Sequence, residues 1–102
     1  MAALGSKLRT LEGGMVAFRC PGCDEAHQIT VEGETRPRWQ FNGDGDRPTF
    51  SPSVLVQWGM GKLPPKVCHS FVTDGRIQFL NDCTHHLAGQ TVELPDFFST
   101  PA

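Results

Sequence analysis

Four cysteines place the strongest constraint on what this chain of 102 residues can fold into. Cys20 and Cys23 are separated by Pro-Gly, and two thiolates at this spacing can chelate one metal ion from a tight turn. Cys68 and Cys83 lie far along the chain and could supply the other two ligands. Hydrophobic residues make up 38% of the sequence, so we expect a thin core that a structural metal would reinforce.

Turn-forming residues predict a small, mainly β single domain of hairpins with at most one short helix. The chain contains 11 glycines and 8 prolines, which break it into short segments. Apolar or alternating stretches predict strands at 15–19, 28–31, 38–42, 53–58, 67–73, 76–83 and 91–94, and one helical turn at 84–89. We expect a flexible N-terminus at 1–14, the domain at 15–95 and a loose tail at 96–102.

The clearest local signal is the Asp-Gly dipeptide at 74–75, which favours a two-residue hairpin turn between the strands that flank it. With that turn, Cys68 and Cys83 fall in diagonal positions on one face of the hairpin. His69 and Asp82 fall in diagonal positions on the other face. The predicted hairpin therefore separates a sulfur-bearing face from a face that carries an imidazole and a carboxylate.

The sulfur-bearing face and the Cys-Pro-Gly-Cys turn together predict a zinc-ribbon-like site. Its expected ligands are Cys20, Cys23, Cys68 and Cys83. Four protein ligands leave no open coordination position, so the Zn²⁺ would be structural. His69, His85 or His86 could replace a cysteine as the fourth ligand, and His27 is a weaker candidate. The alternative is that the cysteines are reduced, buried and bind no metal.

The other face could carry nucleophilic chemistry. Asp82 could fix the tautomer of His69, and His69 could then accept the proton of a serine. Ser51 and Ser53 lie in the Ser-Pro-Ser segment before a predicted strand, and we favour Ser53 because it borders that strand. Asn42 or the glycine loop after it could donate to an oxyanion. The alternative is ordinary turn chemistry beside a surface His–Asp pair.

Five motifs, in order, resemble a known family. They are Cys-Pro-Gly-Cys-x-x-x-His at 20–27, Trp-x-Phe-Asn-Gly at 39–43, Arg-Pro-Thr-Phe-Ser-Pro-Ser-Val at 47–54, Cys-His-Ser-Phe-Val-x-Asp-Gly-x-Ile-x-Phe-Leu at 68–80, and Asp-Cys-Thr-His-x-Leu-Ala-Gly at 82–89. Together they resemble a family of small phage and prophage proteins of unknown function, often labelled ammonia monooxygenase. No copper-like ligand set or membrane span supports that label.

More distant relatives of this family accompany bacterial ubiquitin-like conjugation operons, where the domain acts as a serine-type peptidase on the modifier. If the activity carries over, the resemblance implies that Ser51 or Ser53 and His69 are the matching positions, with Asp82 chosen as the acid on geometry. The sequence departs from those relatives at Cys68, where their motif resembles Ser-His-Phe. Cys68 could therefore be a ligand, a neighbour of the catalytic histidine, or a nucleophile.

The expected function is a zinc-stabilised serine-type peptidase on a ubiquitin-like or other protein tail, associated with phage or prophage. The alternative is a non-enzymatic zinc module that binds a phage or host protein. The net charge of −2 argues against a nucleic-acid partner, including one stacked on Trp39 and Trp58. No apolar run predicts a membrane span or a secretory signal, so we expect a cytoplasmic protein. The oligomeric state stays open.

Overall fold

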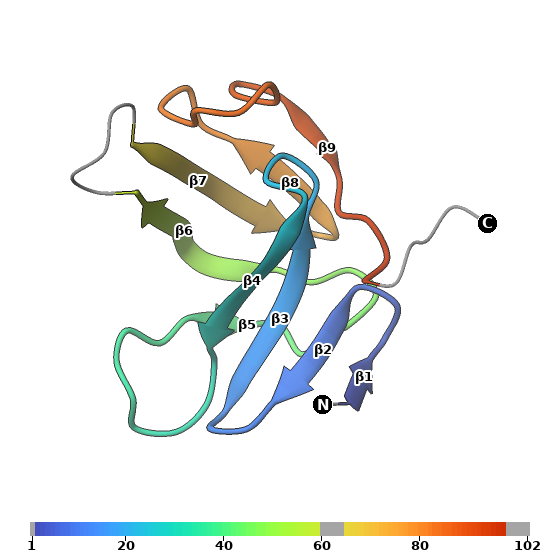
Figure 1. Cartoon of the computed structure of the whole chain (residues 1–102). Coiled ribbons are helices and arrows are strands. Elements are labelled where there is room, and N and C mark those ends of the chain that lie inside the picture. Colours follow the sequence, from blue (N-terminus) through green and yellow to red (C-terminus); the bar gives the residue numbers. More distant parts are fainter. Residues whose placement is uncertain (1, 60–64, 98–102) are drawn as a thin grey trace.

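The computed structural model describes residues 2–59 and 65–97 and shows two antiparallel sheets (Figure 1). The first sheet has the order β1-β2-β3-β4 and the second the order β5-β6-β7-β8-β9, so neighbours in sequence are neighbours in space. The strands are β1 (Ala2–Leu4), β2 (Leu8–Leu11), β3 (Met15–Cys20), β4 (Glu25–Thr30), β5 (Gln40–Phe41), β6 (Phe50–Trp58), β7 (Lys66–Thr73), β8 (Arg76–Phe79) and β9 (Thr91–Glu93).

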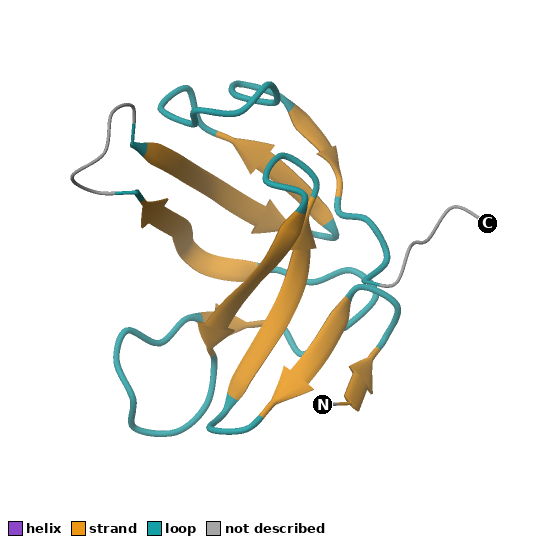
Figure 2. Ribbon diagram, viewed as in Figure 1, coloured by secondary structure: helices purple, strands orange, loops and turns teal. Residues whose placement is uncertain are grey.

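The described part of the chain contains strands and loops but no helix (Figure 2). The predicted mainly β class is therefore confirmed. The segment at 84–89 forms a turn, in which Ala88 N donates to His85 O, and it ends at Gly89 with a positive φ of 79°. None of the described residues forms a helix that could cross a membrane.

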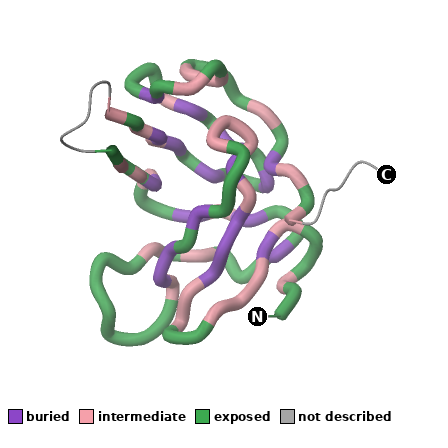
Figure 3. The backbone as a smooth tube through the Cα atoms, in the orientation of Figure 1, coloured by how far each residue is buried: buried purple, intermediate pink, exposed green. Residues whose placement is uncertain are grey.

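The core lies between the two sheets, where buried residues from both meet (Figure 3). Phe18 of β3 stacks on Phe50 of β6 with ring centroids 6.0 Å apart, and Ile77 and Phe79 of β8 are buried with them. Trp39, Phe41 and Trp58 are partly buried and pack against this core, as aromatic residues of a thin β domain should.

The segment at 1–14 differs from our expectation of a flexible terminus. It contains β1 and β2, and Leu8 is fully buried opposite Phe18. Lys7 N donates to Gly45 O, and Gly5 approaches Gly45 so closely that neither could carry a side chain. The two strands are only three and four residues long, so their alternation was too brief to stand out in the sequence.

The expected tail at 96–102 is described only to residue 97. Asp96 forms an ion pair with Lys7 at 3.0 Å, and Phe97 N donates to Ser6 O. These contacts tie the start of the tail to the turn between β1 and β2. Residues 98–102 lie outside the described part.

The β7–β8 hairpin has the predicted register. Asp74 and Gly75 both have positive φ, and Thr73 pairs with Arg76 across them. The pairing reaches Ser70 opposite Phe79, and Leu80 N still donates to His69 O. Strand β8 then ends, four residues earlier than expected, because the chain turns at 81–82.

Candidate active site and metal centre

Ser53, His69 and Asp82 form a continuous chain of hydrogen bonds, the serine line. Ser53 Oγ lies 2.9 Å from His69 Nε2, and His69 Nδ1 lies 3.0 Å from Asp82 Oδ2. With the imidazole proton on Nδ1 donated to Asp82, Nε2 accepts the serine hydroxyl proton. This is the order of groups that serine hydrolases use to activate a nucleophile.

The strand geometry of β6 aims Ser53 at His69. The β6–β7 register shifts between Phe50 and Val54, so residues 51–53 bulge out of the ladder. Trp39 holds this bulge, because its Nε1–H donates to the Ser53 carbonyl at 3.2 Å. Trp39 N in turn donates to Thr30 O at the end of β4. Trp39 thus ties the backbone of Ser53 to the first sheet, a role that the sequence did not indicate.

The turn after β8 brings Asp82 to His69. Cys83 N donates to Leu80 O, which closes the turn, and Thr84 N then donates to Val67 O. The Asp82 side chain is 55% exposed and that of His69 is 24% exposed, so the carboxylate is solvated while the imidazole is partly enclosed.

Two of the predicted site residues lie elsewhere. Ser51 is exposed and pairs with Gln40 of β5, and it is not part of the hydrogen-bonded line. The Asn42 side chain is engaged by its own loop: Nδ2 donates to Arg47 O, and Oδ1 accepts from Asp44 N and Thr49 N. The Asn42 side chain therefore stabilises its own loop, and its donation to an oxyanion stays a prediction.

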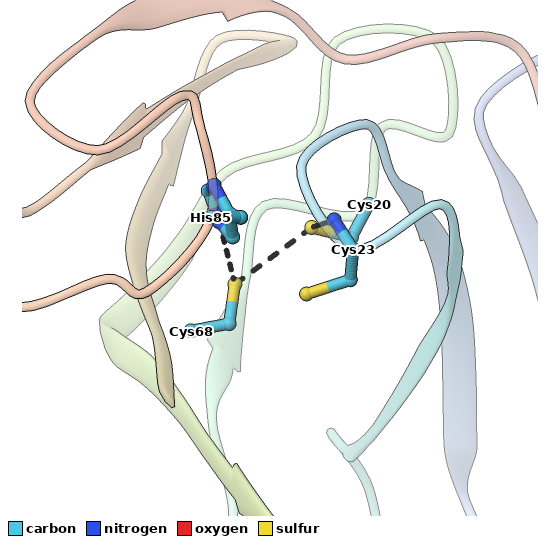
Figure 4. Close-up of side chains that lie close together, drawn as sticks. All are labelled: Cys20, Cys23, Cys68 and His85. Carbon is cyan, nitrogen blue, oxygen red and sulfur yellow. Dashed lines mark hydrogen bonds between the residues drawn. The ribbon is translucent and has the colours of Figure 1, made fainter. Parts of the chain in front are cut away.

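A separate cluster of sulfur and nitrogen atoms lies where β3, β7 and the 80–90 segment meet (Figure 4). Its members are Cys20, Cys23, Cys68 and His85, and their ligand atoms all lie within 4.8 Å of one another. Cys20 and Cys23 come from the tip of the β3–β4 hairpin, where Asp24 N donates to Cys20 O across the turn. The Cys-Pro-Gly-Cys turn is thus placed as the sequence predicts.

The spacing within this cluster fits a tetrahedral metal ion. Cys20 Sγ lies 3.7 Å from Cys68 Sγ, and Cys68 Sγ lies 3.5 Å from His85 Nε2. A tetrahedral zinc ion, with Zn–S of about 2.3 Å and Zn–N of about 2.0–2.1 Å, requires separations of roughly 3.8 Å and roughly 3.6 Å. Three cysteines and one histidine are also a common structural zinc ligand set. The residues present could therefore hold a metal.

The ionisation of the cluster is consistent with a cation-binding role. A hydrogen bond from Cys68 lowers the pKa of Cys20 to about 4, and the same contact raises the pKa of Cys68. Burial raises the pKa of Cys23 to about 12. Burial also lowers the pKa of His85 below its usual range, which favours the neutral, ligating imidazole. A divalent cation bound by the cluster would stabilise the thiolate form of all three cysteines.

Cys83 is not a member of the cluster, although the sequence predicts it as the fourth ligand, and His85 lies with the other three cysteines instead. Its Sγ instead accepts from His69 N and donates to His69 O, each at 3.2 Å. The cause is the turn that ends β8, which moves Cys83 out of the diagonal position and delivers His85 to Cys68. His85 is one of the histidines that the sequence offers as a replacement ligand.

The other candidate histidines lie outside the cluster. His69 is hydrogen-bonded to Ser53, and the His86 ring lies edge-on to the His85 ring, with centroids 6.3 Å apart. His27 is buried against Phe18, and its Nε2 has no partner among the described residues. Gly22 leaves room for the His85 ring, because a Cβ at that position would collide with it.

The comparison with known proteins indicates a family of serine proteases. No curated protein and no solved structure matches this chain. A protein-family model described as bacterial ubiquitination-like system serine protease (BubE) matches residues 4–80, which include Ser53 and His69. This match covers more than half of the 102 residues, and the chain therefore belongs to the BubE family of serine proteases of bacterial ubiquitination-like systems.

Proposed function

We propose that this protein is a zinc-stabilised serine-type peptidase that cleaves at the tail of a ubiquitin-like modifier or of another protein, in a phage or prophage context. The observation that carries the proposal is the Ser53–His69–Asp82 line, with contacts of 2.9 and 3.0 Å. The family supports the reaction class and a protein substrate, and the resemblance of the sequence motifs supports the phage association.

The geometry suggests the following proton path. Ser53 Oγ attacks the scissile carbonyl carbon, and its proton passes to His69 Nε2 while Asp82 stabilises the imidazolium. Breakage of the C–N bond releases the amine, which takes the proton from His69. Water then attacks the acyl ester, gives a proton to His69, and Ser53 regains its hydroxyl as the acid product leaves.

The metal cluster supports stability in this proposal. Cys20, Cys23, Cys68 and His85 would hold Zn²⁺ with no open position, so the ion would fasten β3 and β7 to the 80–90 segment. We expect about one zinc per chain by elemental analysis, in line with one closed four-ligand site.

The test of the peptidase proposal is covalent labelling by a fluorophosphonate probe, which requires an activated serine. We expect stoichiometric labelling of the unaltered protein and none of Ser53→Ala, while Ser51→Ala labels normally. A folded protein that never reacts with the probe would contradict the proposal. It would favour the alternative, a non-enzymatic zinc module that binds a phage or host protein.

A further inference from the structure

Two large hydrophobic side chains, Leu55 and Phe71, are exposed on this protein, at 48% and 41% respectively. No other large hydrophobic residue in the described part of the chain reaches this exposure. Single exposed hydrophobic residues are ordinary on protein surfaces. These two are unusual because they share one face of the second sheet, and it is the face that carries His69.

The sheet register defines how the two residues lie relative to the nucleophile. Leu55 of β6 is directly opposite His69 of β7, so both side chains leave the same face. Phe71 is two residues after His69 and also points outward, since Ser70 and Val72 beside it are buried. One step beyond the Val54–Ser70 pair, the register would bring Ser53 opposite Phe71, where the bulge begins.

Leu55, His69 and Phe71 therefore leave the same face of the sheet, and Ser53 reaches His69 from the adjoining bulge through the 2.9 Å contact. Leu55 flanks His69 across the ladder, and Phe71 flanks it two residues along β7. A polypeptide laid across this face to reach Ser53 Oγ would pass beside these two side chains.

We propose that Leu55 and Phe71 are specificity-determining residues that receive apolar side chains on the two sides of the cleaved bond, in an extended polypeptide laid across β6 and β7. This inference rests on the proposed peptidase function and adds the class of sequence that is cleaved. An apolar substrate residue buries surface against Leu55 or Phe71, whereas an acidic one loses hydration without a partner.

A hollow on the side of Trp39 and Phe41 does not include the reacting residues. A cavity of about 880 Å³ is lined by Leu11, Met15, Trp39 and Phe41, among others, and none of Ser53, His69 and Asp82 lines it. The hollow is therefore separate from the face that carries His69, Leu55 and Phe71.

The experiment compares two internally quenched peptides that differ only in the residues flanking the cleaved bond, leucine in one and aspartate in the other. The unaltered protein should cleave the leucine peptide with a kcat/KM at least about tenfold higher. Leu55→Ser and Phe71→Ser should each lower kcat/KM for the leucine peptide by about tenfold. Gln57→Ser, an exposed change further along the same face of β6, should leave it unchanged.

Fluorophosphonate labelling of the same variants separates this inference from the proposed function. We expect Leu55→Ser and Phe71→Ser to label at the rate of the unaltered protein, because the small probe needs only the activated serine. Normal labelling with unchanged peptide turnover, or with no preference for the leucine peptide, would overturn the inference and leave the peptidase proposal intact. Absence of labelling in the unaltered protein would overturn both.

Discussion

Cys68 and His69 are consecutive residues of β7, and their side chains leave the second sheet through opposite faces. Cys68 is 1% exposed and lies in the metal cluster, whereas His69 faces outward and contacts Ser53. The segment after β8 repeats this arrangement, because Asp82 reaches His69 and His85 reaches Cys68. Two short segments therefore serve both sites, and a metal that fixes Cys68 to His85 would also fix Asp82 beside His69.

Removal of the metal should therefore suppress hydrolysis. We expect the protein treated with a zinc chelator to lose activity and fluorophosphonate reactivity, and added Zn²⁺ to restore both, because the 80–85 segment would no longer be fastened to β7. Parallel measurement of zinc content and labelling rate checks this. Full activity in a protein shown to be metal-free would contradict the coupling.

The ligand set predicts opposite effects for two cysteines. Cys20→Ser should lose zinc and unfold or aggregate, because metal binding and folding are linked. Cys83→Ser should keep about one zinc per chain, because Cys83 contacts only the His69 backbone and a hydroxyl can replace both contacts. Elemental analysis of the two purified variants measures their zinc content and tests this difference. Loss of zinc from Cys83→Ser would restore the four-cysteine site.

The two neighbouring serines provide a matched pair for the nucleophile. Ser53→Ala should lower kcat by roughly 10⁴-fold or more, the scale at which loss of a nucleophile disables a triad. Ser51→Ala should keep normal activity, because Ser51 is outside the hydrogen-bonded line. Thermal unfolding should show both variants folded. Equal activity in the two would exclude Ser53 as the nucleophile.

Asp82→Asn should reduce the rate less than His69→Ala does. The asparagine cannot stabilise an imidazolium, and we expect a loss of roughly 100-fold or more in kcat. The carboxylate is 55% exposed, so water replaces part of its effect. Comparison of the two variants in single-turnover hydrolysis measures this, with zinc content as the control. A His69→Ala variant with normal activity would refute the proposed base.

Gly22→Ala tests the contact between the Cys-Pro-Gly-Cys turn and His85. The new Cβ would collide with the imidazole ring, so His85 must move away from Cys68. We expect weaker zinc retention in a chelator competition and a lower melting temperature. Zinc affinity equal to that of the unaltered protein would show that the turn does not pack on His85 as described.

The sequence predicts the β7–β8 hairpin well because the register of a hairpin depends on the few residues of its turn. Positive φ at Asp74 and Gly75 fixes the β7–β8 register, and this register alone places His69 near the turn that carries Asp82. The fourth ligand could not be predicted in the same way. Whether β8 continues to Cys83 or turns at 81–82 depends on contacts with the Val67 and His69 backbone, which are distant in sequence.

The link from Trp39 to Ser53 shows the same limit. Nothing in the order Trp-Gln-Phe-Asn indicates that an indole N–H will meet the carbonyl of residue 53, because the contact exists only when β5 lies beside the bulge of β6. The sequence does not predict strands β1 and β2 for a related reason. Their strands pack on residues distant in sequence, with Leu8 buried against the rest of the domain.

The hydrogen bond between Trp39 and Ser53 also gives the protein a built-in optical reporter. The chain has two tryptophans and no tyrosine, so its indole fluorescence comes from Trp39 and Trp58. Trp39 is bonded to the nucleophile's own carbonyl, while Trp58 lies at the opposite end of β6, near His27. Replacing Trp58 with phenylalanine would leave a single fluorophore whose spectrum follows the backbone of Ser53 as an acyl group arrives and departs.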